Sequence, residues 1–197
     1  CAHLSSLAEQ AGVRAGRFSS PHLVSFRERV SVEGAPLSCE LVTRGVEAVF
    51  EAAERAHVTM SFFEAAWALA AWAFRELKVT WAIWEVGLGG RLDATNVCEP
   101  VVSALTSVGL DHTHVLGDTL ELIAQEKIAI TRPHRPAFTG ATGEGLRALM
   151  SVAQERVPQL KEAPPLPPSL HVALSAGVHE RNAALALAVA RAAGWSL

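Results

Sequence analysis

Apolar residues recur every three to four positions in several segments of the chain, which is the spacing of a helix with one buried face. The first such segment begins at Cys1 and is closed by Gly12 and Gly16. The same spacing predicts further helices at residues 38–56, 61–77, 119–130 and 180–193. Because no capping residue precedes Cys1, we expect the natural fold to include residues upstream of it.

Short runs rich in apolar and β-branched residues lie between these helices. The runs at 79–87 and 100–109 are continuous, which is typical of strands that are buried on both faces. Shorter strands are predicted at 17–20 and 135–140, and a proline-rich loop at 157–169. Residues 23–38 are expected to form a hairpin or an extended excursion, with a turn at Glu33 and Gly34. Helices that alternate with buried strands predict an α/β fold with a doubly wound, mostly parallel sheet flanked by helices.

The composition excludes several classes of protein. The 197 residues, 50% of them apolar, suffice for one sizeable core, so a single domain is expected. A net charge of −3 from 17 basic and 20 acidic residues, well interspersed, offers no surface for a nucleic acid. The apolar run at 65–74 is shorter than the roughly 20 residues that span a bilayer, and no signal peptide is visible. Three widely spaced cysteines indicate neither disulfides nor zinc, which suits the cytoplasm.

Three predicted strands are each followed by a residue that can bind a metal or move a proton. Ser20 ends the first strand, Glu85 ends the second, and Asp111 and His112 follow the third. In open α/β sheets, ligands bind beyond the carboxyl ends of the strands, so adjacent strands would bring these side chains to one edge. A carboxylate, an imidazole and a hydroxyl suit a hard divalent cation such as Mg²⁺.

Lys127 joins this set because it falls on the apolar stripe of its helix, with Leu120, Ile123 and Ala124. Burial disfavours the charged form of a lysine, and the neutral amine is the form that can be modified.

Each candidate also has a simpler explanation. Ser20 ends a strand, Glu85 pairs with Arg91, His112 caps the next turn, and Lys127 extends its stem to solvent. The glycines at 87–90 also suggest a dinucleotide loop, but the third glycine and the following helix of that motif are missing. A nicotinamide-binding module is therefore disfavoured.

Several long motifs occur in an order that resembles the folylpolyglutamate synthase and dihydrofolate synthase branch of the Mur ligases. They are FSSPHLVSFRERV at 18–30, SFFEA at 61–65, EVGLGGRLDATN at 85–96, VGLDHTHVLGDTLELIAQEKIAI at 108–130 and GVHERNAALAL at 177–187. An ordered series of this kind is far more specific than one short pattern. The resemblance implies a Mur-ligase-type central ATPase domain.

The resemblance also implies a reaction and its metal ligands. ATP would phosphorylate the carboxylate of dihydropteroate or a folate, and the amine of L-glutamate would then attack the acyl phosphate. Ser20 and Glu85 match ligands of one Mg²⁺, and Glu85, His112 and Lys127 match ligands of a second. The family's lysine at the position of Lys127 is carbamylated, which makes it an oxygen-donating anion.

The remaining matches concern the organic substrates. Ser61, Phe63 and Asp93 match positions that hold the pterin, and Asn182 matches a residue that contacts the adenine end of ATP. Ser61 has the alternative role of a helix cap, because Glu64 follows at capping-box spacing. Asn182 has the alternative of an ordinary polar residue in the first turn of a helix.

Some features depart from the family pattern. The family's glycine-rich phosphate-binding loop should end just before Cys1, and its smaller C-terminal domain should follow Leu197. We therefore expect residues 1–197 to be a partial central domain that does not turn over ATP alone. Glu180 replaces the usual glutamine, and Ala129 a common glycine. Another Mur-type ligase for cell-wall peptides, a catalytically inactive remnant and an interaction module stay open as alternatives, as does the choice between dihydropteroate and folate.

Overall fold

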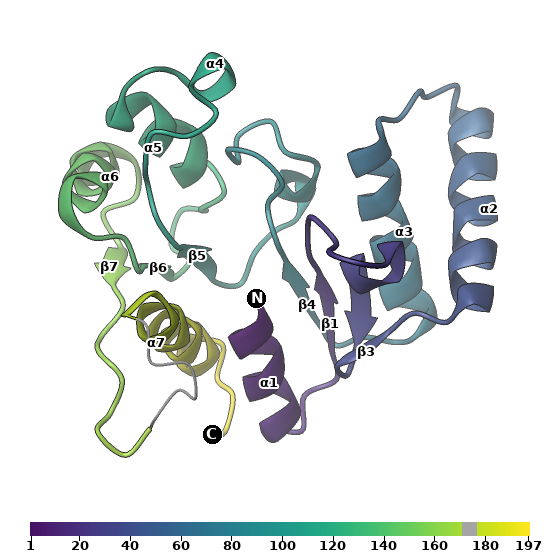
Figure 1. Ribbon diagram of the computed structural model, residues 1–197, viewed down its shortest axis with the longest axis horizontal. Coiled ribbons are helices and arrows are strands. Elements are labelled where there is room, and N and C mark those ends of the chain that lie inside the picture. The colour runs from purple at the N-terminus through teal and green to yellow at the C-terminus, as the bar shows by residue number, and fades with distance from the viewer. Residues whose placement is uncertain (171–176) are drawn as a thin grey trace. The chain divides into compact units, whose positions relative to one another are not determined.

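The computed structural model describes residues 1–170 and 177–197, and it divides into two compact units (Figure 1). The first unit covers Cys1–Gly87 and the second covers Leu88–Leu197. Each unit has its own sheet and its own buried apolar cluster. No helix within the described ranges is both long and apolar enough to cross a membrane.

The sheet of the first unit has four strands in the order β3-β2-β1-β4. They are β1 (Ala15–Phe18), β2 (Val30–Val32), β3 (Ala35–Pro36) and β4 (Trp81–Trp84). Strand β1 pairs with β4 in parallel and with β2 in antiparallel orientation. The predicted hairpin is confirmed, with positive φ angles of 50° at Glu33 and 77° at Gly34, as a tight two-residue turn requires.

One expectation about burial is wrong for β4. Ile83 is the one residue of this strand that is fully buried, whereas Ala82 is exposed. The reason is topological, because β4 is the edge strand of its sheet. A continuous apolar run therefore did not distinguish an edge strand from a central one.

The helices of the first unit are α1 (Ala2–Gln10), α2 (Cys39–Ala56), α3 (Phe62–Glu76) and the short 3-10 helix η1 (Phe26–Arg29). Helix α2 packs against α3, and α3 covers one face of β1. Glycines permit these close approaches: Gly45 faces Leu69 and Trp72, and Gly16 faces the ring of Phe74. The sheet and α3 thus share one apolar cluster.

The second unit holds a parallel sheet in the order β5-β6-β7, formed by β5 (Ser103–Leu105), β6 (Ala137–Thr139) and β7 (Leu160–Glu162). Its helices are η2 (Ala94–Val97), α4 (Thr113–Leu116), α5 (Leu120–Ile128), α6 (Gly143–Arg156) and α7 (Gly177–Ala192). Helices α5 and α6 lie on one side of this sheet and α7 lies on the other (Figure 1). A parallel sheet flanked by helices is the predicted α/β architecture.

Four elements of this unit were not predicted. Helices η2, α4 and α6 were missed, and β7 lies within the segment that was interpreted as a loop. Strand β7 has the sequence Leu-Lys-Glu, with prolines on both sides, and is defined by its pairing with β6. Its own residues carry no strand pattern, so pairing with β6 decides its structure.

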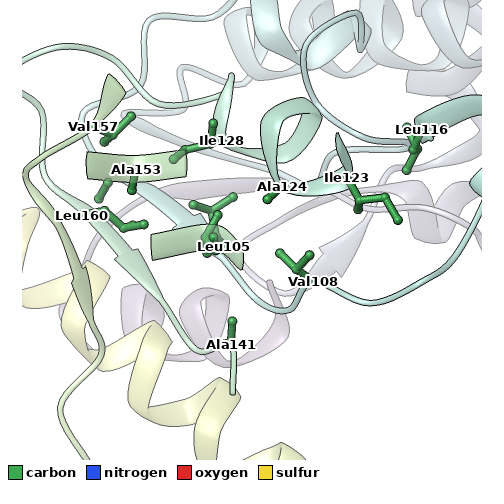
Figure 2. Packing of buried hydrophobic residues seen from close by; sticks show 12 residues of the cluster. Leu105, Val108, Leu116, Ile123, Ala124, Ile128, Ala141, Ala153, Val157 and Leu160 are labelled. Carbon is green, nitrogen blue, oxygen red and sulfur yellow. The ribbon is translucent and has the colours of Figure 1, made fainter. Parts of the chain in front are cut away.

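An apolar cluster fixes α5 over the sheet of the second unit (Figure 2). Leu105 and Leu160 come from the strands, Ile123 and Ile128 from α5, and Ala153 from α6. Ile123 and Ile128 are fully buried. The inward face of α5 is therefore held rigidly along its whole length, up to the turn that contains Lys127.

Candidate functional site

Ser20 and Glu85 meet at the carboxyl ends of β1 and β4. The parallel register pairs Phe18 with Trp84, and the Glu85 backbone N–H donates to the Phe18 carbonyl oxygen at 3.1 Å. The Ser20 backbone N–H donates to the Glu85 carboxylate oxygen Oε2 at 3.4 Å. Both residues are half-buried. The expectation that these two strand ends bring Ser20 and Glu85 together is confirmed, and their oxygen atoms suit a hard cation.

The loop that follows Ser20 is held by Glu28 and Arg29. The Glu28 carboxylate accepts hydrogen bonds from the backbone N–H groups of Leu23, Val24 and Ser25, at 2.9, 3.1 and 2.7 Å. The bond from Leu23 is the largest of the effects that lower the pKa of Glu28. The buried Arg29 donates from Nε to His22 Nδ1 at 2.8 Å, and the Ser20–Pro21 peptide bond is cis. Ser20 therefore starts a loop with a defined conformation.

Ser61 caps helix α3, as its alternative explanation predicted. Its hydroxyl accepts from the Glu64 backbone N–H at 3.3 Å, and its own N–H donates to the Glu64 carboxylate at 2.7 Å. Both hydrogen bonds lower the pKa of Glu64, and the one with the Ser61 side chain has the larger effect. The capping box is confirmed, and the pterin contact of Ser61 stays a prediction.

Phe62 and Phe63 face different surroundings at the start of α3. Phe63 is half-buried and packs edge-to-face on Phe18, with ring centroids 5.6 Å apart. Phe62 is 62% exposed, and the Arg29 guanidinium carbon lies 5.3 Å from the centre of its ring. The sequence interpretation missed Phe62 and Arg29. The sequence did carry a signal for Phe62. Two consecutive aromatic residues at the start of a helix point in different directions, so one of them was bound to be more exposed than the other.

Asp93 organises the loop that contains it. Its carboxylate accepts hydrogen bonds from the backbone N–H and the hydroxyl of Thr95, at 3.0 and 2.6 Å, and from the Leu88 backbone N–H at 3.1 Å. It thereby caps η2. Asp93 thus has a structural function in the second unit, and its predicted contact with the pterin stays a prediction.

The glycines before Asp93 allow this loop to dock on the C-terminal end of α5. A Cβ atom on Gly90 would lie 2.9 Å from the Glu126 carbonyl oxygen and 3.3 Å from that of Lys127. The Arg91 backbone N–H donates to the Glu126 carbonyl at 3.0 Å, and its side chain pairs with the Glu126 carboxylate at 2.8 Å. Arg91 was considered as a partner for Glu85, and its partner is instead Glu126. Close packing thus explains why Gly90 has no side chain.

His112 and Lys127 both belong to the second unit. His112 occupies the N-cap position of α4 with a φ of 49°, but its side chain makes no capping bond, and its imidazole is 54% exposed, 3.8 Å from the Asp111 carboxylate. The alternative of a capping side chain is therefore wrong. Lys127 is half-buried beside Ile123, Ala124 and Ile128, as predicted from its stripe. Within the described residues its amine has no hydrogen-bond or ion-pair partner.

The predicted metal site unites residues of both units, since Glu85 belongs to the first and His112 and Lys127 to the second. No three His, Cys, Asp or Glu side chains gather as metal ligands in the part of the chain that the structure describes. The predicted ligands differ from such a group, because they include a serine and a lysine. The three-residue site stays a prediction.

Asn182 lies in α7 and is half-buried. A cavity of about 720 Å³ opens beside this helix in the second unit. Its lining comes from the ends of β6 and β7, from the proline-rich segment and from one face of α7, including Thr139, Thr142, Glu162, Pro165, Glu180 and Arg181. Asn182 is not one of the lining residues, and its predicted contact with adenine stays a prediction.

No protein-family model matches the chain, but it is similar in sequence and in structure to known proteins. It is 40% identical over 203 residues to the mitochondrial folylpolyglutamate synthase of Cricetulus griseus, which covers 96% of this chain and 35% of that protein. It is similar to Escherichia coli FolC in complex with DHPP and ADP, with a TM-score of 0.88 and 34% identity over 100% of this chain and 50% of that one.

A second solved relative carries a metal. The bifunctional folylpolyglutamate synthase/dihydrofolate synthase of Yersinia pestis, complexed with AMPPNP and Mn ion, gives a TM-score of 0.86 and 34% identity over 100% of this chain and 51% of that one. The chain spans about a third of the length of the curated relatives that it matches over most of its own length. On these similarities, the chain belongs to the folylpolyglutamate synthase/dihydrofolate synthase family.

Proposed function

We propose that this chain supplies the metal-binding and acceptor-binding residues of an ATP-dependent ligase that joins L-glutamate to dihydropteroate or a folate. The contact between Ser20 and Glu85 at the carboxyl edge of β1 and β4 is the observation that carries the proposal. Relatives of known structure bind DHPP and ADP, or AMPPNP and Mn ion, which supports the same classes of ligand here.

Two magnesium ions are proposed. Ser20 and Glu85 would hold the first, and Glu85, His112 and Lys127 the second. The half-buried amine of Lys127, which has no hydrogen-bond or ion-pair partner among the described residues, is proposed as the group that is carbamylated. When bound, magnesium neutralises phosphate charge and aligns the phosphoryl group with its acceptor. Glu85 contributes a carboxylate whose position is fixed by the register of two strands.

The acceptor would be held by Ser61, Phe63 and Asp93. Ser61 and Asp93 each cap a helical segment, so both are already ordered before a ligand arrives. The half-buried ring of Phe63 rests against Phe18, which leaves part of its surface for stacking on a flat heterocycle. Asn182 would contact the adenine end of ATP.

The proposed partners are ATP, L-glutamate and the pterin-containing acid, with no nucleic acid and no membrane. The proposed location is the cytoplasm, where Cys1, Cys39 and Cys98, none of them in a disulfide, stay reduced.

The first experiment measures the binding of Mn²⁺ to the chain by electron paramagnetic resonance. The change Glu85→Gln is expected to weaken this binding by more than about tenfold, because it removes the charged oxygen donor. Glu54→Gln is the matched control, since Glu54 is an exposed acid of the same unit. Equal Mn²⁺ affinity in the wild type and in Glu85→Gln would contradict the metal assignment.

The second experiment measures the binding of dihydropteroate through tryptophan fluorescence. Saturable binding that weakens in Phe63→Ala supports the acceptor site, and the absence of binding by the wild-type chain contradicts it. Ligation is then measured, in the full-length gene product, as ADP release that requires both L-glutamate and the pterin acid.

A further inference from the structure

Arg132 makes the densest set of side-chain hydrogen bonds around the candidate residues of the second unit. It follows the end of α5 by four positions and lies outside every motif on which the family resemblance rests. Its side chain is 20% exposed. A guanidinium group presents five N–H donors in a rigid plane, so its partners are fixed in direction as well as in distance.

Most N–H groups of Arg132 donate to acceptors in residues 96–99, which follow Asp93 in the chain. Nη1 donates to Asn96 Oδ1 at 3.1 Å, and Nη2 donates to the carbonyl oxygens of Asn96 and Cys98 at 2.7 and 3.0 Å. Nε donates to the Glu99 carboxylate at 3.3 Å. Nη1 also reaches the carbonyl oxygens of Ala129 and Thr131, at 3.3 and 3.2 Å. One side chain therefore joins the segment 96–99 to the end of α5.

The other end of the same loop is bound to the same helix. Arg91 contacts Glu126 through its backbone and its side chain, and Asn96 Nδ2 donates to the Arg91 carbonyl oxygen at 3.1 Å. Asn96 is thus the shared element of both attachments. Asp93 lies between Arg91 and Asn96, and its carboxylate orders the intervening turn. The loop is thus fixed at one end to the last turn of α5, which contains Lys127, and at the other end to the residues just after that turn.

We propose that Arg132 is a positioning residue for the acceptor substrate: it holds the loop 88–99, and with it Asp93, at a fixed place relative to Lys127. The proposal rests on the proposed function, because it assigns Asp93 to the pterin and Lys127 to the metal. A positive charge alone would not hold the loop in this way, because the partners of Arg132 are mostly neutral carbonyl oxygens. They lie in different directions from the side chain, and the planar guanidinium group can donate to several of them at once.

The test compares four variants with the wild-type chain. Arg132→Ala removes all of the contacts, and Arg132→Lys keeps the charge and the stem but removes the planar group. Asn96→Ala removes the side-chain hydrogen bonds of Asn96 with Arg91 and Arg132, and it serves as a second test in case Arg132→Ala does not fold. Arg135→Ala is the matched control, because Arg135 is exposed, lies three positions away and makes no side-chain bond with the described residues.

Hydrogen–deuterium exchange followed by mass spectrometry reports on the loop without any ligand. Amides of residues 88–99 are expected to exchange roughly tenfold faster in Arg132→Lys and Asn96→Ala than in the wild type, while those of α3 in the first unit exchange at the wild-type rate. Unchanged exchange of the loop in Arg132→Lys would overturn the proposal. Faster exchange everywhere would overturn it too, since that result indicates general destabilisation.

Dihydropteroate titration separates this proposal from the proposed function. Arg132→Lys is expected to weaken dihydropteroate binding by about tenfold, and Arg135→Ala to leave it unchanged. If the wild type binds dihydropteroate and Arg132→Lys binds it equally well, the positioning role is wrong and the proposed function stands. If the wild type does not bind dihydropteroate, both the proposed function and the positioning role are wrong, whatever the exchange data show of the loop.

Discussion

Gly90→Ala tests whether the glycines of the loop serve close packing on α5. The added methyl group would lie 2.7 Å from Ile130 Cγ2 and 2.9 Å from the Glu126 carbonyl oxygen. The isoleucine can rotate away, but the carbonyl belongs to the last turn of the helix and moves only with its backbone. Overpacking of this kind costs about 1–3 kcal/mol.

A second term follows from the same displacement. If the loop lifts away from the helix, the hydrogen bond from the Arg91 N–H to the Glu126 carbonyl is lost, which costs about 0.5–1.5 kcal/mol. We therefore expect the free energy of unfolding to fall by about 1.5–4.5 kcal/mol. Urea titration followed by far-UV circular dichroism measures this loss.

Gly109→Ala is the matched control for this change. No atom lies within 4 Å of the position of its Cβ, and its φ is not in the left-handed region. Its effect is expected to stay within about 0.5 kcal/mol. A Gly90→Ala variant that unfolds at the wild-type urea concentration, or at that of Gly109→Ala, would refute the packing argument.

Three further predictions concern other parts of the chain. Ser61→Ala is expected to lower the free energy of unfolding by about 1 kcal/mol, because a helix cap is lost. Glu64→Gln is expected to remove a stabilisation that is present above the unfolded-state pKa of Glu64 and is lost as the pH falls through its lowered folded-state pKa. The urea midpoints of both variants at neutral and acidic pH measure these effects. Lys127→Ala should weaken Mn²⁺ binding, with partial recovery in added acetate. Leu149→Ala, in a fully buried position, should cost about 2–5 kcal/mol in urea unfolding, and the half-exposed Leu122→Ala much less.

The positions of α2 and α3 were predictable because their signals are local. The expected helix at 38–56 is α2, Cys39–Ala56, and the one at 61–77 is α3, Phe62–Glu76. In both cases a serine immediately before the helix accepts a hydrogen bond from the first turn. Periodicity and a capping hydroxyl lie within a few residues of each other, so no tertiary information was needed to place these boundaries.

The contact between Ser20 and Glu85 was predictable for a related reason. Each residue follows a short apolar run, and parallel pairing of the two runs determines which residues meet at their ends. The contacts of Arg132 were not predictable in this way. Its loop partners lie 33 to 36 positions away, and two of them are backbone carbonyl oxygens, which every residue has. Nothing in the sequence distinguishes such an acceptor.

These same contacts bear on why the amine of Lys127 has no partner among the residues that the structure describes. The last carbonyl groups of a helix receive no hydrogen bond from an N–H group of the same helix. The side chain of a lysine in the final turn commonly donates to them. In α5 other groups do so: the Arg91 N–H binds the Glu126 carbonyl, and the Thr131 N–H and hydroxyl bind that of Ile128. Arg132 reaches the carbonyl of Ala129, just beyond the helix. The loop and its arginines thus replace Lys127 in its ordinary structural role, which leaves its amine available for the metal chemistry proposed here.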